Sequence, residues 1–315
     1  MNQSKKVKDG ALFIGVFLGI LLISLFIPFA LLICMFLLPI PFVVYTYRYD
    51  WQPALVMLAV AVLLSLMIAP MVTLPMTVLV GLGGIMIGAA INHRLTSYET
   101  WARGSIGFIA GLLFVFLFSQ FVLQINWTEE IDQLVEESLE ISNQLVNQFG
   151  LGEQTDEQLE ALEDQLTILK DLIPVTISII AIILAFITQW VSYKVINRLE
   201  NKQFKFPLFR SLRLPAPIIW IYFFAIVLML INSDAGSMLY IGSYNIFILV
   251  GFFVALQGFS FIFFFAYEKK ISHILPVTSI ILAVLFPFIV LYLVRILGII
   301  DIGFGLRDRL SKDHK

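Results

Sequence analysis

The sequence predicts an all-α fold: a polytopic transmembrane helical bundle of eight or nine spans, with an amphipathic helical hairpin on the extracytoplasmic side. Three observations lead to this class, namely the composition, the length of the apolar segments, and one acidic segment that interrupts them. Hydrophobic residues make up 60% of the 315 positions and charged residues only 13%, whereas soluble domains carry roughly 25% charged residues. This composition excludes a soluble globular protein and makes the lipid bilayer the expected surroundings. The net charge of −2 says nothing about partners by itself, and no nucleic-acid partner is expected.

The N-terminal part contains five apolar segments of membrane-spanning length, since a helix needs about 20 apolar residues to cross a hydrocarbon core of roughly 30 Å. We expect spans over 11–30, 33–47, 53–69, 72–91 and 105–125. The second is short and bent at Pro39 and Pro41, and Pro70 separates the third from the fourth. The fourth span contains glycines that allow close helix packing: Gly81, Gly83, Gly84 and Gly88.

Residues 126–171 differ from the rest of the chain, because 13 Asp or Glu fall here against one basic residue, Lys170. Apolar residues recur near the helical period on both sides of a Gly-Leu-Gly sequence. Thr128 is a candidate N-cap for a first helix, and a capping box is expected at Thr155 for a second. The segment therefore predicts a hairpin of two amphipathic helices, whose carboxylates mostly form a solvated face rather than a metal or acid–base site.

After the hairpin we expect a sixth span, a basic loop and three further apolar segments. These segments cover 174–194 for the sixth span, then 216–232, 242–267 and 274–300, the last interrupted by Pro287. The chain is expected to divide into a six-span core at 1–194 that includes the hairpin at 126–172, a basic cytoplasmic loop at 195–215, and a C-terminal membrane extension at 216–315.

The loop charges predict the orientation, because Lys and Arg accumulate on the cytoplasmic side of membrane proteins. With alternating spans, one side receives 14 Lys or Arg and the other only Lys170 among its internal loops. The N-terminus and the basic loop are therefore expected in the cytoplasm, and the acidic hairpin outside. Two alternatives remain for the basic C-terminal tail. Nine full spans place it outside, whereas a last segment that re-enters at Pro287 leaves it inside.

No pattern in the chain indicates catalysis, so we expect no enzyme, no cofactor and no metal site. Ionisable residues are nearly absent from the spans, and Arg295 is the main exception. It is expected to extend toward the membrane interface, with contact to an ion or a substrate as the alternative. The best ligand-binding candidates are Gln120 and Gln124, one helix turn apart near the outer end of the fifth span, with Trp127 just above. Interhelical hydrogen bonding is the alternative role for the two glutamines.

Small residues recur every four positions on the first span, at Ala11, Gly15 and Gly19. They share one helix face, and small residues let a second helix backbone approach closely. The partner at this face is either another helix of this chain or another membrane protein.

Four stretches together resemble the YybS family of bacterial membrane proteins, which is defined by a domain of unknown function. They are ALFIGVFLGILLISLFIPF, LPIPFVVYTYRYDW, the Gly-rich fourth span and LGIIDIGFGLRDRL. The resemblance runs the length of the chain and implies a multi-pass protein of the bacterial inner membrane.

The YybS family is in turn distantly similar to the substrate-binding subunits of energy-coupling-factor vitamin transporters. Such subunits have six spans, bind vitamins from outside, and dock a transmembrane coupling subunit that works with ATPases. Docking uses small residues spaced by four on the first helix, a pattern that Ala11, Gly15 and Gly19 match. The leading hypothesis is therefore a small-solute binding or uptake subunit. The hairpin and the three extra apolar segments depart from that pattern, so a second hypothesis stays open: a non-transporting scaffold or regulator acting through the acidic hairpin.

Overall fold

The computed structural model describes residues 3–27, 29–149, 168–232, 234, 236–272 and 274–312, and their regular structure is helical throughout. The chain forms two compact units, Met1–Phe206 (unit 1) and Pro207–Lys315 (unit 2). The boundary falls inside the basic loop expected at 195–215. Residues before it pack back on α9, where the Asn197 side chain bonds the backbone N–H and C=O of Phe204 at 2.7 and 2.8 Å.

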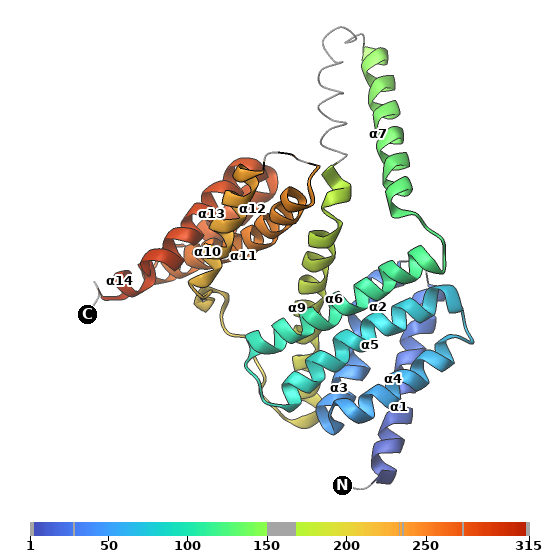
Figure 1. Ribbon diagram of the computed structural model, residues 1–315. Coiled ribbons are helices and arrows are strands. Elements are labelled where there is room, and N and C mark those ends of the chain that lie inside the picture. The colour runs from blue at the N-terminus through green and yellow to red at the C-terminus, as the bar shows by residue number, and fades with distance from the viewer. Residues whose placement is uncertain are drawn as a thin grey trace. The chain divides into compact units, whose positions relative to one another are not determined.

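Unit 1 contains the N-terminal helices (Figure 1). They are α1 (Gln3–Phe26), α2 (Ala30–Leu37), α3 (Ile40–Tyr49), α4 (Trp51–Ser65), α5 (Pro70–Asn92), α6 (Ser97–Phe121), α7 (Trp127–Phe149) and α9 (Ile173–Glu200).

Prolines and capped turns set the boundaries of these helices. Pro39 separates α2 from α3, which confirms the expected bend in the second apolar segment, and Pro70 opens α5. Between α3 and α4 the chain turns at Asp50, whose φ is 70° and whose side chain accepts the Trp51 N–H at 2.7 Å. Thr96 is the N-cap of α6 and forms a capping box, which was not predicted from the sequence.

The Gly-rich helix α5 lies at the centre of unit 1, packed against α3, α4 and α6. Its glycines are in close contact with neighbouring helices: Gly81 and Gly83 face the Leu58 and Phe108 side chains, and Gly84 and Gly88 face backbone. A Cβ added at Gly84 would lie 2.7 Å from the Pro39 carbonyl oxygen, and one at Gly88 would lie 2.6 Å from the Val43 carbonyl oxygen. The close packing expected from these glycines is confirmed. The surrounding core is apolar and filled, with Phe17, Phe42 and Phe108 among its largest fully buried side chains.

The acidic segment begins with the expected amphipathic helix, α7, in which Val135 is the one buried residue among the described side chains. Its cap was wrongly placed at Thr128. The Asn126 side chain accepts the Thr128 N–H at 3.2 Å and donates to Glu129 at 2.7 Å, so the helix begins two residues earlier. Lys170 pairs with Asp132 of α7. The second predicted helix, with its capping box at Thr155, lies mostly outside the described residues.

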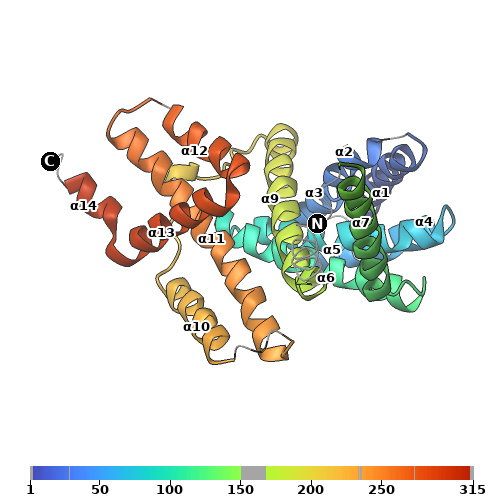
Figure 2. The same cartoon turned by 90° about the horizontal axis from the view of Figure 1, so that it is seen from above.

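Unit 2 is built around α11, the longest helix of the described chain (Figure 2). Its elements are η1 (Phe209–Ser211), α10 (Pro217–Ile231), α11 (Met238–Glu268), α12 (Ile274–Leu285), α13 (Pro287–Phe304) and α14 (Leu306–Lys312). Helix α13 crosses α11 at paired glycines. A Cβ at Gly258 would lie 2.0 Å from the Val294 carbonyl oxygen, and one at Gly298 would lie 2.1 Å from the Val254 carbonyl oxygen.

Seven helical segments of the described chain are long and apolar enough to cross a membrane, with α2 and α3 counted together as Ala30–Tyr49. Three shorter apolar helices accompany them, α4, α10 and α12. The longest of the three has 15 residues and is therefore about 22 Å long, less than a hydrocarbon core of roughly 30 Å. The number of complete crossings, predicted as eight or nine, stays a prediction.

The last apolar segment is broken where Pro287 predicts. Helix α12 ends at Leu285 and α13 begins at Pro287. After α13 the chain returns to the start of unit 2, where Arg307 Nη1 donates to the Arg210 carbonyl oxygen at 2.8 Å. Helix α14 and η1 therefore lie at the same end of unit 2. The side of the membrane on which the tail lies stays a prediction.

Candidate functional site

Of the three predicted ligand residues, Gln120 lies in the last turn of α6 and Trp127 opens α7. Helix α6 ends at Phe121, so Gln124 lies in the turn after it and the expectation that the two glutamines are one helix turn apart is wrong. Trp127 Nε1 donates to Ser119 Oγ at 2.8 Å, and the indole stacks on Phe116. Gln120 and Gln124 are exposed, and Gln124 has a left-handed φ of 57°. None of the three lines a cavity described below, so their role in ligand binding stays a prediction.

The small-residue face of α1 is open. Phe13 and Phe17 are buried in unit 1, whereas Ala11, Gly15 and Gly19 are exposed. A Cβ added at Gly15 or Gly19 would meet no atom within 4 Å. Since successive helical residues are about 100° apart, this face lies opposite the buried one. At the N-terminal end of the face, Ala11 lines a groove of about 460 Å³ together with Pro53 and Val56 of α4, so the fully open part is the one at Gly15 and Gly19.

Unit 1 also has a charged cavity of about 890 Å³ where α1, α3, α5 and α9 come together. Arg48 bridges Asp9 at 3.0 Å and Glu200 at 2.6 Å, and the Tyr49 hydroxyl donates to Asp9 at 2.7 Å. These contacts join α1, α3 and α9 at the end of unit 1 that carries the N-terminus. The remaining charged residues of the lining are basic: Lys5, Arg94 and Lys202. Their sign matches the cytoplasmic side predicted for this end.

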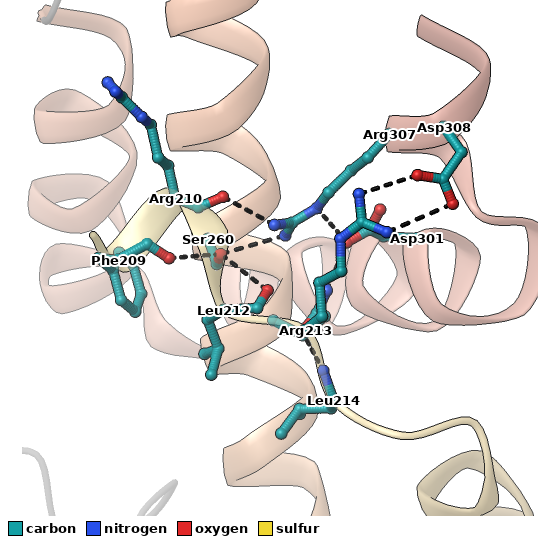
Figure 3. A network of polar contacts seen from close by, with 10 residues as sticks. Phe209, Arg210, Leu212, Arg213, Leu214, Ser260, Asp301, Arg307 and Asp308 are labelled. Atoms are coloured by element: carbon teal, nitrogen blue, oxygen red, sulfur yellow. Dashed lines mark hydrogen bonds and ion pairs between the residues drawn. The ribbon is translucent and has the colours of Figure 1, made fainter. Parts of the chain in front are cut away.

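A buried polar network joins the start and the end of unit 2 (Figure 3). Arg307 and Asp301 form an ion pair at 2.9 Å, with side chains only 3% and 2% exposed. The other guanidinium nitrogens of Arg307 donate to the Arg210 carbonyl and, at 3.1 Å, to Ser260 Oγ. Asp301 also accepts from Gln257 Nε2 at 2.5 Å. This buried arginine therefore has both a counter-charge and hydrogen-bond acceptors.

The network fastens the segment 209–214 to α11 and α14. Ser260 Oγ donates to the Phe209 carbonyl at 2.7 Å, and the Leu214 N–H donates to Gln257 Oε1 at 3.0 Å. At the surface, Arg213 pairs with Asp308 at 2.9 Å. Because every polar group of the buried part has a partner of this chain, the network serves as a structural clamp.

The sequence signal for this clamp was the DIGFGLRDRL stretch. Gly305, with a φ of 57°, ends α13 and allows a sharp turn into α14. That turn brings Arg307 back onto Asp301, six residues earlier. In the sequence these residues carry the family resemblance, and the ion pair between Asp301 and Arg307 was not predicted.

Arg295 is the second arginine of unit 2 and has different surroundings. It lines a cavity of about 420 Å³ between α10, α11 and α13, together with Tyr222, Phe247 and Tyr292. Its guanidinium lies 5.9 Å from the Phe247 ring centroid, and its Nε is buried without a hydrogen-bond partner. A Cβ added at Gly251, near the middle of α11, would lie 3.2 Å from the guanidinium carbon. The guanidinium therefore packs against the middle of α11, and its extension toward the membrane interface stays a prediction.

The described residues bring no three His, Cys, Asp or Glu side chains together in a group that could hold a metal ion. Their polar clusters are ion pairs and hydrogen-bond networks on helices. The arrangement is suited to packing, docking and binding of charged groups.

The comparisons with known proteins agree with the expected family resemblance. The family model described as "Predicted membrane protein (DUF2232)" matches residues 15–302. An uncharacterised protein, YybS of Bacillus subtilis (strain 168), is 27% identical over 311 residues, which cover 99% of this chain and 100% of the relative. No solved structure matches the chain. Both matches span unit 1 and unit 2.

Proposed function

The chain belongs to the family of predicted membrane proteins that share DUF2232, and we propose that it is a small-solute binding or uptake subunit of the bacterial inner membrane. In this role unit 1 docks a transmembrane coupling subunit, whose ATPases supply the energy. The observation that carries the proposal is the open face of α1 at Ala11, Gly15 and Gly19.

An open small-residue face on an apolar helix favours a protein partner for a physical reason. Lipid tails are as apolar as leucine side chains, so helices in a bilayer associate through close van der Waals contact rather than hydrophobic burial. Glycines spaced by four provide that contact over successive turns. Helix α1 has used its bulky side, including Phe13 and Phe17, for the core of unit 1. The opposite side is thus free for a second backbone.

The charges support the orientation that this role requires. Basic residues line the charged cavity at the N-terminal end of unit 1. The acidic helix α7 follows α6 and precedes α9 along the chain. The positive-inside rule then places the N-terminus and the loop before unit 2 in the cytoplasm. It also leaves the acidic hairpin outside, on the side from which a solute would enter.

The test is co-purification of the tagged chain in mild detergent from the bacterium that encodes it. We expect the wild type to carry a polytopic membrane protein and ATPase activity. Gly15→Leu places a bulky side chain on the open face and should reduce both at least about tenfold, a loss of roughly 1.4 kcal/mol or more in association free energy. Val16→Leu is the matched control, because Val16 is exposed on α1 but off the small-residue face.

Equal recovery with Gly15→Leu, or a wild type that purifies without membrane partner or ATPase activity, contradicts docking through α1. The unfolding temperature of each variant is measured in the same detergent. A Gly15→Leu protein that unfolds like the wild type shows that any lost partner is not lost through misfolding.

A second candidate function is a non-transporting scaffold or regulator. The filled apolar core of unit 1 favours it, since the core holds fully buried Phe17, Phe42 and Phe108. Helix α7 also exposes apolar residues beside its carboxylates, with Leu134 at 61% and Ile141 at 52% exposure. Deletion of 128–172 distinguishes the two roles. A scaffold loses its outer partner, whereas a transporter subunit retains its coupling partner and ATPase activity.

A further inference from the structure

Arg295 lies in the middle of the apolar part of unit 2. It is close to the centre of α13, which runs from Pro287 to Phe304. Its guanidinium packs at Gly251, and Gly251 is close to the centre of the 31-residue α11. With a rise of about 1.5 Å per residue, Gly251 is roughly 20 Å from the nearer end of α11. The side chain is too short to cover this distance, so its charge remains at this depth.

The cavity beside Arg295 combines a small polar end with an apolar body. Three side chains provide the polar end: Arg295, Tyr222 and Tyr292. The Tyr222 hydroxyl is within hydrogen-bonding reach of the guanidinium, and the Tyr222 ring stacks on Phe247 at 4.9 Å. The rest of the lining is aliphatic or aromatic and comes from all three helices: Ile226, Met229, Leu230, Phe247, Ile296 and Ile299.

The described residues supply no counter-charge for Arg295. None of the ion pairs found among them involves this residue, and its Nε has no hydrogen-bond partner. Charged side chains in the apolar part of a membrane are costly unless they are paired, and they mark binding or transport sites. The clamp in the same unit provides the contrast, because the buried Arg307 is neutralised by Asp301, whereas Arg295 is partly buried and has no such partner among the described residues.

We propose that this cavity binds the oxyanion of an amphiphile, a carboxylate or phosphate attached to an apolar body. The guanidinium would take the oxyanion through its free donors, which suit planar, bidentate recognition. The tyrosine hydroxyls would orient it, and the aliphatic lining would hold the apolar body. Leu230 and Tyr292 are 77% and 65% exposed, so the cavity opens at the surface of unit 2 and a ligand can enter from the bilayer. The site is independent of the proposed docking through α1.

Its size fits this class of ligand. Small-molecule sites in proteins measure roughly 300–1,000 Å³ and combine an apolar lining with few polar groups. At about 420 Å³, the cavity accommodates a head group with the first part of a chain. The oxyanion can come from a free amphiphile such as a fatty acid or from a bilayer lipid, and the experiment separates these two sources.

The test measures thermal unfolding of the full-length chain in nanodiscs. In phosphatidylcholine nanodiscs, oleate should raise the unfolding temperature of the wild type, because a ligand that binds only the folded state stabilises it. Oleyl alcohol has the same chain without the charge and should not. In a parallel arm without oleate, phosphatidylglycerol replaces part of the phosphatidylcholine, which supplies the oxyanion from a lipid head group.

Arg295→Gln removes the charge and keeps a polar, though shorter, side chain. We expect the variant to need at least about tenfold more oleate for the same shift, which corresponds to the loss of charge-assisted hydrogen bonds. Arg309→Gln is the matched control, since Arg309 is an exposed cation of unit 2, and it should respond like the wild type. An Arg295-dependent shift in either arm supports the site and identifies the source of the oxyanion.

The proposal is overturned if neither oleate nor phosphatidylglycerol stabilises the wild type. It is equally overturned if the shifts are the same in Arg295→Gln, or if oleyl alcohol acts as strongly as oleate. Misfolding does not obscure the result, because the variants are compared by their ligand-dependent shift from their own starting temperature.

Discussion

Helices α1 and α5 both have glycines four residues apart, yet the two pairs have opposite surroundings. Gly84 and Gly88 of α5 lie against the carbonyl oxygens of Pro39 and Val43, with no room for a methyl group. A Cβ added at Gly15 or Gly19 of α1 would instead meet no atom within 4 Å. The same spacing thus serves packing within unit 1 in one helix and leaves a free face in the other. Glycines in unit 2 follow the α5 pattern where α11 crosses α13.

The largest effect in this comparison is expected for Gly258→Ala. Its added Cβ would lie 2.0 Å from a backbone oxygen of α13, so the two helices must separate. Overpacking of this kind costs about 3 kcal/mol or more when backbone has to move. Thermal or denaturant unfolding in one detergent measures the loss.

Gly242→Ala is the control in the same helix, because a Cβ there meets nothing within 4 Å. It should match the wild type or gain up to about 1 kcal/mol from its better helix propensity. Similar losses at positions 242 and 258 would show that the crossing is not as close as described.

In unit 1, Gly88→Ala should destabilise the protein by about 1–3 kcal/mol. The new methyl group would meet the Val43 carbonyl oxygen and Thr46 Cβ, both at 2.6 Å. The expected readout is a lower unfolding temperature with unchanged helix content at low temperature by circular dichroism. An unfolding temperature equal to that of the wild type would mean that α3 and α5 can separate without cost.

Gly251→Ala tests the glycine next to Arg295. Here the nearest atoms belong to the end of a flexible side chain, at 3.2 Å, so the guanidinium can move aside and the loss of stability should stay below about 1 kcal/mol. The displacement should instead weaken the oleate-dependent thermal shift. A large loss of stability with an unchanged oleate response would contradict this assignment.

The smallest effect on stability is expected for Gly19→Ala. The side chain points into open space, and replacing glycine by alanine in a helix contributes up to about 1 kcal/mol of stability. The purified protein should therefore unfold at the same or a slightly higher temperature. A clear loss would show that this face of α1 packs within the chain.

Much of the fold could be predicted because proline and apolar length act locally. Pro39, Pro70 and Pro287 separate helices where expected. Apolar length was less precise, since turns in a membrane protein are apolar too. The third span was expected to reach residue 69, but α4 ends at Ser65 and the apolar residues that follow form a turn. The cap of α7 was misplaced because Asn126 and Thr128 are both followed by acidic residues.

The candidate sites depend on contacts that spacing alone does not determine. The spacing of Ala11, Gly15 and Gly19 indicates one shared face, but α1 is apolar all round, so the sequence does not tell which face is buried. For Arg295 the sequence shows only that the residue lies within the last apolar segment, whereas its packing at Gly251 and its unpartnered Nε appear only in the folded chain. The clamp between Asp301 and Arg307 required the turn at Gly305.

The clamp between Asp301 and Arg307 also relates to the side of the membrane on which the C-terminal tail lies. Arg307 contacts the Arg210 carbonyl, and Arg213 pairs with Asp308, so the described tail and the basic loop share one end of unit 2. The charge of the basic loop predicts that it is cytoplasmic, and the shared end extends this prediction to the tail.

The central claim is that the open face of α1 contacts another membrane protein. Its most direct measurement is photo-crosslinking in living bacteria, with a photoreactive side chain at position 15 and, as a control, at position 16. We predict that position 15 forms one strong crosslink to a polytopic membrane protein, which position 16 forms weakly or not at all. Crosslinks from position 15 only to lipid, or only to another part of the same chain, would contradict the claim.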